Sequence, residues 1–126
     1  MRKLTYNKKL NKKRLSKLII KQARQIMKRL IDFDYEVCFP ITEKGIITDV
    51  RFIGSRHDTW FDINELKDMV DSPVIGTFHT HPHGECDFSR NDIRSAILGG
   101  ELVTAVGVPR TGCVKILFLD EYRGRI

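Results

Sequence analysis

The sequence predicts an α/β fold in which a mixed β-sheet is flanked by helices, with an added basic helix at the N-terminus. Two observations lead to this prediction. Segments with a helical spacing of apolar residues alternate along the chain with short extended runs, the order expected when helices pack on a sheet. The chain has 126 residues, of which 41% are hydrophobic, so it is long enough to bury a core as one domain.

A helix is expected over residues 12–31. Its apolar residues recur three or four positions apart, which is the spacing of one helix face, and neither Gly nor Pro interrupts the segment. Residues 1–11 carry few apolar groups and are expected to fray. The apolar stripe of the helix consists of Leu15, Leu18, Ile19, Ala23, Ile26 and Leu30.

The charge of the chain is unevenly distributed. Residues 1–30 contain 12 Lys or Arg and no acid, whereas the remaining residues contain 10 Lys or Arg against 16 Asp or Glu. We therefore divide the chain into a basic N-terminal arm and helix, residues 1–31, and a mildly acidic domain, residues 32–126. The arm could contact the phosphates of nucleic acid or lie on an anionic membrane surface. Alternatively, its apolar stripe packs on the domain and its basic face is simply solvated.

The domain is expected to contain two helices and five strands. The helix at 62–70 opens with a capping-box pattern, and the helix at 89–100 begins at a Ser cap and ends at two glycines. The strands are recognised as apolar runs bounded by turn residues. They are 35–41 and 45–54, joined by the turn "TEKG", then 73–81, and finally 102–108 and 113–119, joined by the turn "PRTG".

The cysteine content and the hydropathy of the chain predict its compartment. Three cysteines, Cys38, Cys86 and Cys113, are too sparse and odd in number for a disulfide framework, which favours a reducing cytoplasm. No apolar run approaches the ~20 residues that a transmembrane helix needs. The basic N-terminus is not followed by the apolar segment of a signal peptide. We therefore expect a cytoplasmic protein.

The stretch "GTFHTHPHGECDFSRND" (76–92) predicts a metal site. His79 and His81 are two positions apart on a strand, so their side chains project from the same face. Asp92 is the third residue of the following helix, and the intervening loop can return it to the two imidazoles. Two nitrogen ligands and one oxygen ligand, with a fourth position left for water, describe a catalytic zinc site. The alternative is that Ser89 and Asp92 form only a capping box.

The same stretch resembles a known signature. "HTHP", six residues and then "SRND" fill every position of the H-x-H-P-x6-S-x-x-D motif of the JAMM/MPN+ (Mov34/MPN/PAD-1) zinc metalloproteases. The resemblance is to the stand-alone prokaryotic and archaeal members and covers residues 33–120. It implies a cytidine-deaminase-like α/β sandwich that binds one Zn²⁺ per chain through His79, His81 and Asp92.

The resemblance also implies two catalytic residues. In the family, a Glu on an earlier strand is the general base, and "YEVCFPI" offers Glu36 for that role. The alternative is that Glu36 lies at an edge and faces water. The family's glycine-containing segment is here Phe39-Pro40, so this strand is expected to be an edge strand or to end early, which leaves Glu43 as a second candidate base. Ser89 is expected to hydrogen-bond the substrate carbonyl oxygen, or to act only as a helix cap.

Two residues of the intervening loop are assigned less specific roles. His83 is expected to be exposed and without a function. Cys86 is expected to be either oxidised or simply facing solvent, because a fourth protein ligand would fill the position that catalysis leaves for water.

The function implied by the resemblance is a zinc-dependent peptidase or isopeptidase. Its substrates would be conjugates of ubiquitin-like or small sulfur-carrier-like proteins, so the expected partner is a protein with a ubiquitin-like tail. One alternative is a RadC-like, DNA-associated protein that shares the motif and uses the basic arm to bind nucleic acid. Another is a non-catalytic scaffold of the MPN type, although such scaffolds lack the metal ligands.

Overall fold

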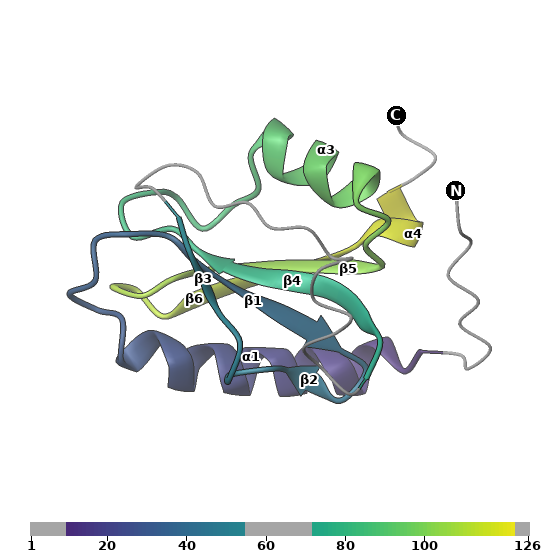
Figure 1. Cartoon of the computed structure of the whole chain (residues 1–126), viewed down its shortest axis with the longest axis horizontal. Helices are drawn as coiled ribbons and strands as arrows, with labels where there is room; N and C mark the ends of the chain where they lie inside the picture. The colour runs from purple at the N-terminus through teal and green to yellow at the C-terminus, as the bar shows by residue number, and fades with distance from the viewer. Residues whose placement is uncertain (1–9, 55–71, 123–126) are drawn as a thin grey trace.

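A mixed, curled six-stranded β-sheet carries its two longer helices on opposite faces (Figure 1). The computed structural model describes residues 10–54 and 72–122. The strand order is β2-β1-β4-β5-β6, with β3 paired to β1; β4 and β5 are parallel, and the other pairs are antiparallel. The strands are β1 (Val37–Thr42), β2 (Gly45–Ile46), β3 (Phe52–Ile53), β4 (Val74–Thr80), β5 (Val103–Val108) and β6 (Cys113–Phe118).

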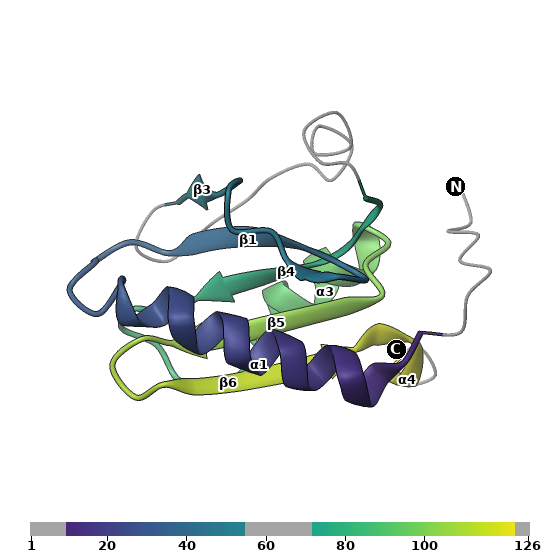
Figure 2. The same ribbon diagram turned by 90° about the horizontal axis from the view of Figure 1, so that it is seen from below.

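The N-terminal helix, α1 (Lys12–Lys28), is an integral part of the core. The side chain of Asn11 caps it by accepting a hydrogen bond from the Arg14 backbone N–H at 3.1 Å. Every fourth residue from Leu15 to Met27 is buried, as helical geometry requires for one face. The expected helix is confirmed, although it ends at Lys28 rather than at residue 31. The apolar stripe belongs to the core, as one of the alternatives for this helix required. Figure 2 shows α1 lying along the sheet.

One face of the sheet supplies the partners for α1. The strand register places Phe78 level with Phe39 on β1 and with Ala105 on β5. Residues paired in this way project from the same face of the sheet. The rings of Phe39 and Phe78 stack with their centroids 6.1 Å apart. Gly107 lets the helix approach closely, since a Cβ there would lie 2.5 Å from the Met27 sulfur. This face therefore forms the apolar core.

Two strand predictions need correction. The run 45–54 is not one strand but two, β2 and β3, which pair with opposite ends of β1. Pro40 does not make β1 an edge strand, because β1 lies between β4 on one side and β2 and β3 on the other. The physical reason is that β2 reaches only 41–42 and β3 only 37–38, so Pro40 faces the interruption between them. The helix expected at 62–70 lies outside the described residues.

The second helix, α3 (Arg90–Leu98), connects the two parallel strands β4 and β5. Ser89 caps it, and Gly99 and Gly100 end it, as the sequence predicts. Gly100 has φ +71°, a conformation that favours glycine. The "TEKG" and "PRTG" turns are also confirmed between β1 and β2 and between β5 and β6. The crossover places the N-terminus of α3 beside the end of β4, where the two histidines lie.

The chain closes with a short helix, α4 (Leu119–Tyr122). Within the described residues, no helix has both the length and the apolar character needed to cross a membrane.

Candidate metal centre

The two histidines lie on the sheet face opposite α1. His79 is level with Cys38 on β1 and with Val106 on β5, so it occupies the middle of the sheet. His81 directly follows β4, and its backbone N–H donates to the Gly107 carbonyl at 2.8 Å. This bond continues the extended backbone past the end of the strand. The two imidazoles therefore emerge side by side, as their spacing in the sequence predicts.

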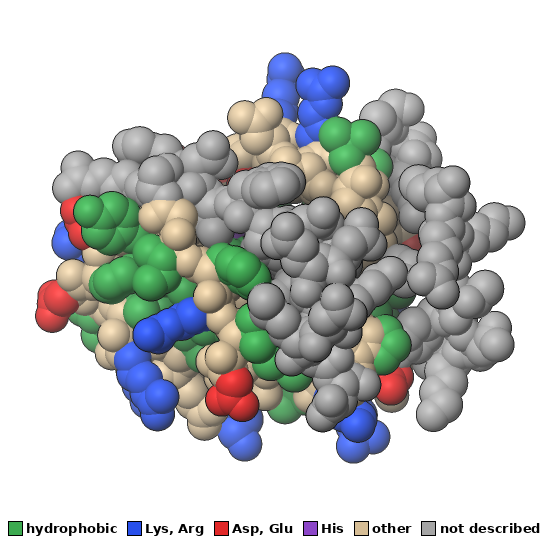
Figure 3. All heavy atoms as spheres, in the orientation of Figure 1, with side chains coloured by type: hydrophobic (Ala, Val, Ile, Leu, Met, Phe, Trp, Pro, Cys, Tyr) green, Lys and Arg blue, Asp and Glu red, His purple; other side chains and the backbone are tan. Residues whose placement is uncertain are grey.

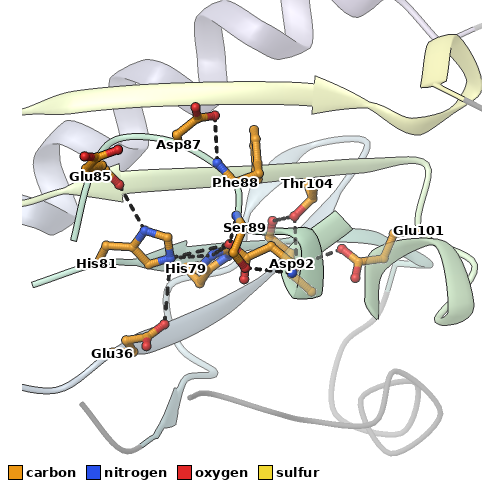
Figure 4. A network of polar contacts seen from close by, with 11 residues as sticks. Glu36, His79, His81, Glu85, Asp87, Phe88, Ser89, Asp92, Glu101 and Thr104 are labelled. Atoms are coloured by element: carbon orange, nitrogen blue, oxygen red, sulfur yellow. Dashed lines mark hydrogen bonds and ion pairs between the residues drawn. The ribbon is translucent and has the colours of Figure 1, made fainter. Parts of the chain in front are cut away.

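The three predicted ligands converge on one point (Figure 4). His79 Nε2 and His81 Nε2 are 3.1 Å apart. Asp92 Oδ2 lies 3.5 Å from His79 Nε2 and 3.6 Å from His81 Nε2. Two nitrogens and one carboxylate oxygen, contributed by β4, the residue after it and α3, thus face one another.

Glu36 joins the same cluster from the residue before β1. Its Oε1 lies 4.0 Å from His81 Nε2, and the ligand atoms of Glu36, His79 and His81 all fall within 4.8 Å of one another. These three residues could hold a metal ion. The Val37 N–H donates to Thr80 Oγ1 at 3.0 Å, which fixes the start of β1 against β4.

The two candidate bases differ sharply in environment. Glu36 is only 7% exposed, so the alternative that it faces water is wrong. Glu43 is exposed in the turn after β1, at the other end of the strand from the histidines. The structure therefore brings Glu36, and not Glu43, to the cluster.

Asp92 serves the helix and the cluster with the same oxygen. The Ser89 backbone N–H donates to Asp92 Oδ2 at 2.8 Å, and the Asp92 N–H donates to Ser89 Oγ at 3.0 Å. The capping box is thus present together with the approach to the histidines, so the two interpretations are compatible. Burial alone would raise the pKa of Asp92, but the hydrogen bond and charge of His79, with the Ser89 N–H, lower it to about 2. Asp92 is consequently ionised at neutral pH.

A backbone carbonyl orients His81. His81 Nδ1 lies 3.1 Å from the Glu85 carbonyl oxygen. Because a carbonyl can only accept, Nδ1–H is the donor, and Nε2 is left with its lone pair toward the cluster. Burial lowers the pKa of His81, although the Glu85 carbonyl opposes that shift. The lowered pKa favours the neutral imidazole, and the contact with the Glu85 carbonyl aims its Nε2 at the cluster, as metal binding requires.

Sequence reasoning missed a buried acid beside the cluster. Glu101 is 8% exposed, and its Oε1 accepts a hydrogen bond from Thr77 Oγ1 at 2.7 Å. Thr104 Oγ1 lies 3.5 Å from the same hydroxyl. Burial raises the pKa of Glu101 to about 7, although the Thr77 bond and the charge of His79 oppose this. A single Glu that follows a helix ending in Gly-Gly is usually a surface residue, so no local sequence pattern indicated that Glu101 is buried.

Cys38 lies on the same face and is chemically quiet. Burial raises the pKa of its thiol well above the ordinary value, and the charges of Glu101 and Glu36 add to that effect. The thiol is therefore protonated at neutral pH, which is unsuited to metal binding.

The loop between the histidines and Asp92 is tied to neighbouring segments. A disulfide joins Cys86 to Cys113, the first residue of β6, so Cys86 is oxidised, which is one of the two states expected for it, although its pairing with Cys113 was not predicted. The pairing was hidden because 27 residues separate the two positions and only the β5–β6 hairpin brings them together. His83 is exposed, as expected, and its ring contacts the Asp34 carboxylate.

Comparison of the chain with known proteins adds no identification. No protein-family model matches the sequence, and no curated protein does so either.

Proposed function

We propose that this chain is a zinc-dependent peptidase or isopeptidase of the JAMM/MPN+ type. The observation that carries the proposal is that Glu36, from an earlier segment of the chain, converges with the neighbouring residues His79, His81 and Asp92. The mixed sheet with α1 and α3 on opposite faces supports the cytidine-deaminase-like sandwich that the motif implies. A non-catalytic MPN scaffold is disfavoured because the chain retains the ligand residues.

The donor set fits zinc better than it fits a hard cation. Two imidazole nitrogens and one carboxylate oxygen are the usual ligands of catalytic zinc, whereas calcium and magnesium prefer oxygen alone. His79, His81 and Asp92 would hold the ion. A zinc ion bound there would supply an activated water and would polarise the substrate carbonyl.

Glu36 is placed to move the proton. Its carboxylate lies beside the cluster, 4.0 Å from His81 Nε2, and it is not one of the three proposed ligands, so it can accept a proton without the loss of a ligand. It would then donate that proton to the departing amine nitrogen. Burial of the carboxylate keeps competing water away from this transfer.

Ser89 is placed to assist at the substrate oxygen. Its Oγ accepts the Asp92 N–H, so its own hydroxyl proton can be donated elsewhere. A donor aimed at the developing oxyanion contributes about 3–4 kcal/mol to lowering the barrier. The cap and the donor are thus compatible roles for one side chain.

The substrate class and the compartment complete the proposal. By resemblance, the substrate is the conjugate of a ubiquitin-like or small sulfur-carrier-like protein. A cytoplasmic location belongs to the same proposal. The Cys86–Cys113 disulfide makes that location testable, because the cytosol keeps most thiols reduced.

The decisive experiment measures zinc content and cleavage in matched variants. We expect one zinc per chain by elemental analysis, and loss of that zinc in His81→Ala. Glu36→Gln should retain zinc and cleave a ubiquitin-like protein linked to lysine about 10²–10⁴-fold more slowly. Glu43→Gln is the matched control and should behave as the parent. Zinc-free parent protein would refute the metal assignment, and full activity in Glu36→Gln would refute the base.

The outer face of α1 favours a second candidate function, the RadC-like association with DNA. α1 contains no acid, and its exposed basic residues border a groove lined by Lys17, Ile20, Lys21, Arg24, Gln25 and Lys28. Basic side chains project along the lower edge of Figure 3, where Figure 1 places α1. Such a surface suits the phosphates of duplex DNA better than a substrate carbonyl, and it lies across the sheet from the candidate metal centre.

A gel shift tests this second function. We expect salt-sensitive binding of duplex DNA, with a double variant Lys17→Gln/Lys21→Gln lowering the salt slope by about 2. Lys44→Gln, in the exposed β1–β2 turn, is the control for charge alone. Binding unaffected by the double variant would exclude this face of α1 as the DNA contact.

A further inference from the structure

The loop that separates the two ligand-bearing segments is anchored twice to β6. This site loop, residues 82–88, follows His81 and leads to Ser89. Its Cys86 forms the disulfide with Cys113, and its Asp87 Oδ1 accepts a hydrogen bond from Lys115 Nζ at 2.9 Å. The two anchoring residues, Cys86 and Asp87, are adjacent in the loop, and their partners, Cys113 and Lys115, lie near the beginning of β6. The two anchors therefore hold the same short stretch of backbone.

The anchored stretch contacts His81 directly. The Glu85 carbonyl, which accepts the Nδ1–H of His81 at 3.1 Å, belongs to the peptide unit whose nitrogen is that of Cys86. The disulfide therefore fixes a residue one peptide bond from the acceptor that sets the tautomer and the orientation of His81. Figure 4 shows the Glu85–His81 contact on the side of the ring away from the cluster.

The other end of the site loop leads to Asp92. Asp87 Oδ1 also accepts the Phe88 N–H at 2.8 Å, and the next residue is the helix cap Ser89. Ser89 in turn fixes Asp92 through the capping box. The position of the site loop is thus connected through consecutive bonds to His81, which follows β4, and to Asp92 on α3.

The two anchors differ in strength and in chemistry. Asp87 and Lys115 form an exposed ion pair, a kind of contact that contributes little. The disulfide is covalent, but Cys113 is exposed and Cys86 is only partly buried, so a thiol in solution can reach it. The dominant anchor is therefore also the one that a reductant can remove.

We propose that Cys86 and Cys113 are positioning residues for His81, so that the metal affinity of the site depends on the oxidation state of their disulfide. This inference rests on the proposed zinc site. Reduction by a cellular thiol of low molecular weight would proceed by exchange. Two thiols of the reductant lose two electrons and form its disulfide, and Cys86 and Cys113 gain two electrons and two protons to become free thiols.

The first test measures zinc affinity by competition with a chelator. The samples are oxidised parent, parent reduced with a phosphine, and the double variant Cys86→Ser/Cys113→Ser. We expect zinc to bind about 10–100-fold more weakly to the reduced parent and to the double variant, the range seen when an outer partner of a ligand is lost. Phosphine added to the double variant should change nothing, which controls for the reductant itself.

A matched control separates the disulfide from the ion pair. Lys115→Met removes the second anchor and leaves the disulfide, and we expect its zinc affinity to lie within about threefold of the parent. The single variant Cys113→Ser leaves the Cys86 thiol near the site. Zinc binding that is weak in the double variant and restored in Cys113→Ser would identify that thiol as a ligand and would overturn the positioning role.

The second test needs no metal. Nitrogen-15 NMR of the zinc-free protein reports which ring nitrogen of His81 carries the proton. We expect the Nδ1–H form in the oxidised parent and a mixture of tautomers after reduction. If oxidised and reduced protein bind zinc equally and share one tautomer, the positioning role is wrong while the zinc site stands. If the oxidised parent does not bind zinc, both proposals are wrong.

Discussion

The two faces of the sheet use the same strands for different purposes. On β4, Phe78 points toward α1 and is fully buried among apolar side chains, whereas its neighbour His79 points the other way into the polar cluster. The face beneath α3 also carries buried polar or acidic residues. Such residues destabilise a fold unless they are hydrogen-bonded, ion-paired or bound to a metal ion. The buried polar residues of this face are Glu36, Thr77, His79, Glu101 and Thr104.

The helices that cover the two faces also differ, in how many of their residues they bury against the sheet. α1 has 17 residues and buries four of them against the sheet, whereas α3 has nine residues and buries Ala96. A short, lightly packed helix leaves the cluster partly accessible, and it presents its N-terminus rather than its side to the histidines. The comparison indicates that the α1 face supplies most of the stability, whereas the α3 face carries the candidate metal centre.

The strongest test of this division uses the adjacent residues Phe78 and His79. Phe78→Ala should lower the free energy of unfolding by about 3–5 kcal/mol, because it opens a cavity in the core. His79→Ala should cost the zinc-free protein only about 1–2 kcal/mol, mainly through the hydrogen bond to Asp92, but should abolish zinc binding. Urea denaturation of the zinc-free variants and a zinc titration measure both quantities. Equal losses of stability would contradict the division.

Glu101 gives a smaller effect that depends on pH. Its pKa is about 7 in the folded protein and about 4.5 when unfolded, so between these values only the folded state holds the proton. The free energy of unfolding should therefore fall as pH rises from 4.5 to 7, by about 3 kcal/mol in total from this group. Glu101→Gln should remove that fall. Denaturation of zinc-free parent and variant at both pH values gives the difference, and parallel pH profiles would show that Glu101 is not responsible.

Ser89 should show the smallest effect on stability. Ser89→Ala removes the acceptor for the Asp92 N–H and should lower the free energy of unfolding by about 1 kcal/mol. Ser95→Ala, on the exposed surface of the same helix, is the matched control and should cost nothing, because Ala favours helix interiors. Thermal denaturation compares the two. If Ser89→Ala loses no more peptidase activity than its lower fraction of folded protein explains, Ser89 acts only as a helix cap.

Residues close in sequence were predictable, and residues brought together by the fold were not. The spacing of His79, His81 and Asp92 and the cap at Ser89 are local patterns, and the structure assembles them as expected. The packing of α1 in the core was one of the alternatives that its apolar stripe left open. Glu101 and the Cys86–Cys113 pair depend instead on which strands become neighbours, and β-strand pairing leaves no local mark on single residues.

Glu36 is an intermediate case. Only the resemblance to a family motif singled it out, and its burial beside His81 supports that choice over Glu43. Pro40 was misread because a proline usually marks an edge strand, whereas here it lies between the ladders of two short strands that share one side of β1, and only its carbonyl is bonded there, by the Ile47 N–H.

The double use of Asp92 has a consequence for reading related sequences. A descendant of this chain that no longer bound a metal would still gain from an acid at position 92, because it caps a helix. Imidazoles at 79 and 81 offer the bare fold no comparable benefit, so drift should erase them first. Surviving histidines, rather than the surviving serine and aspartate, are therefore the better guide to which relatives keep the metal cluster.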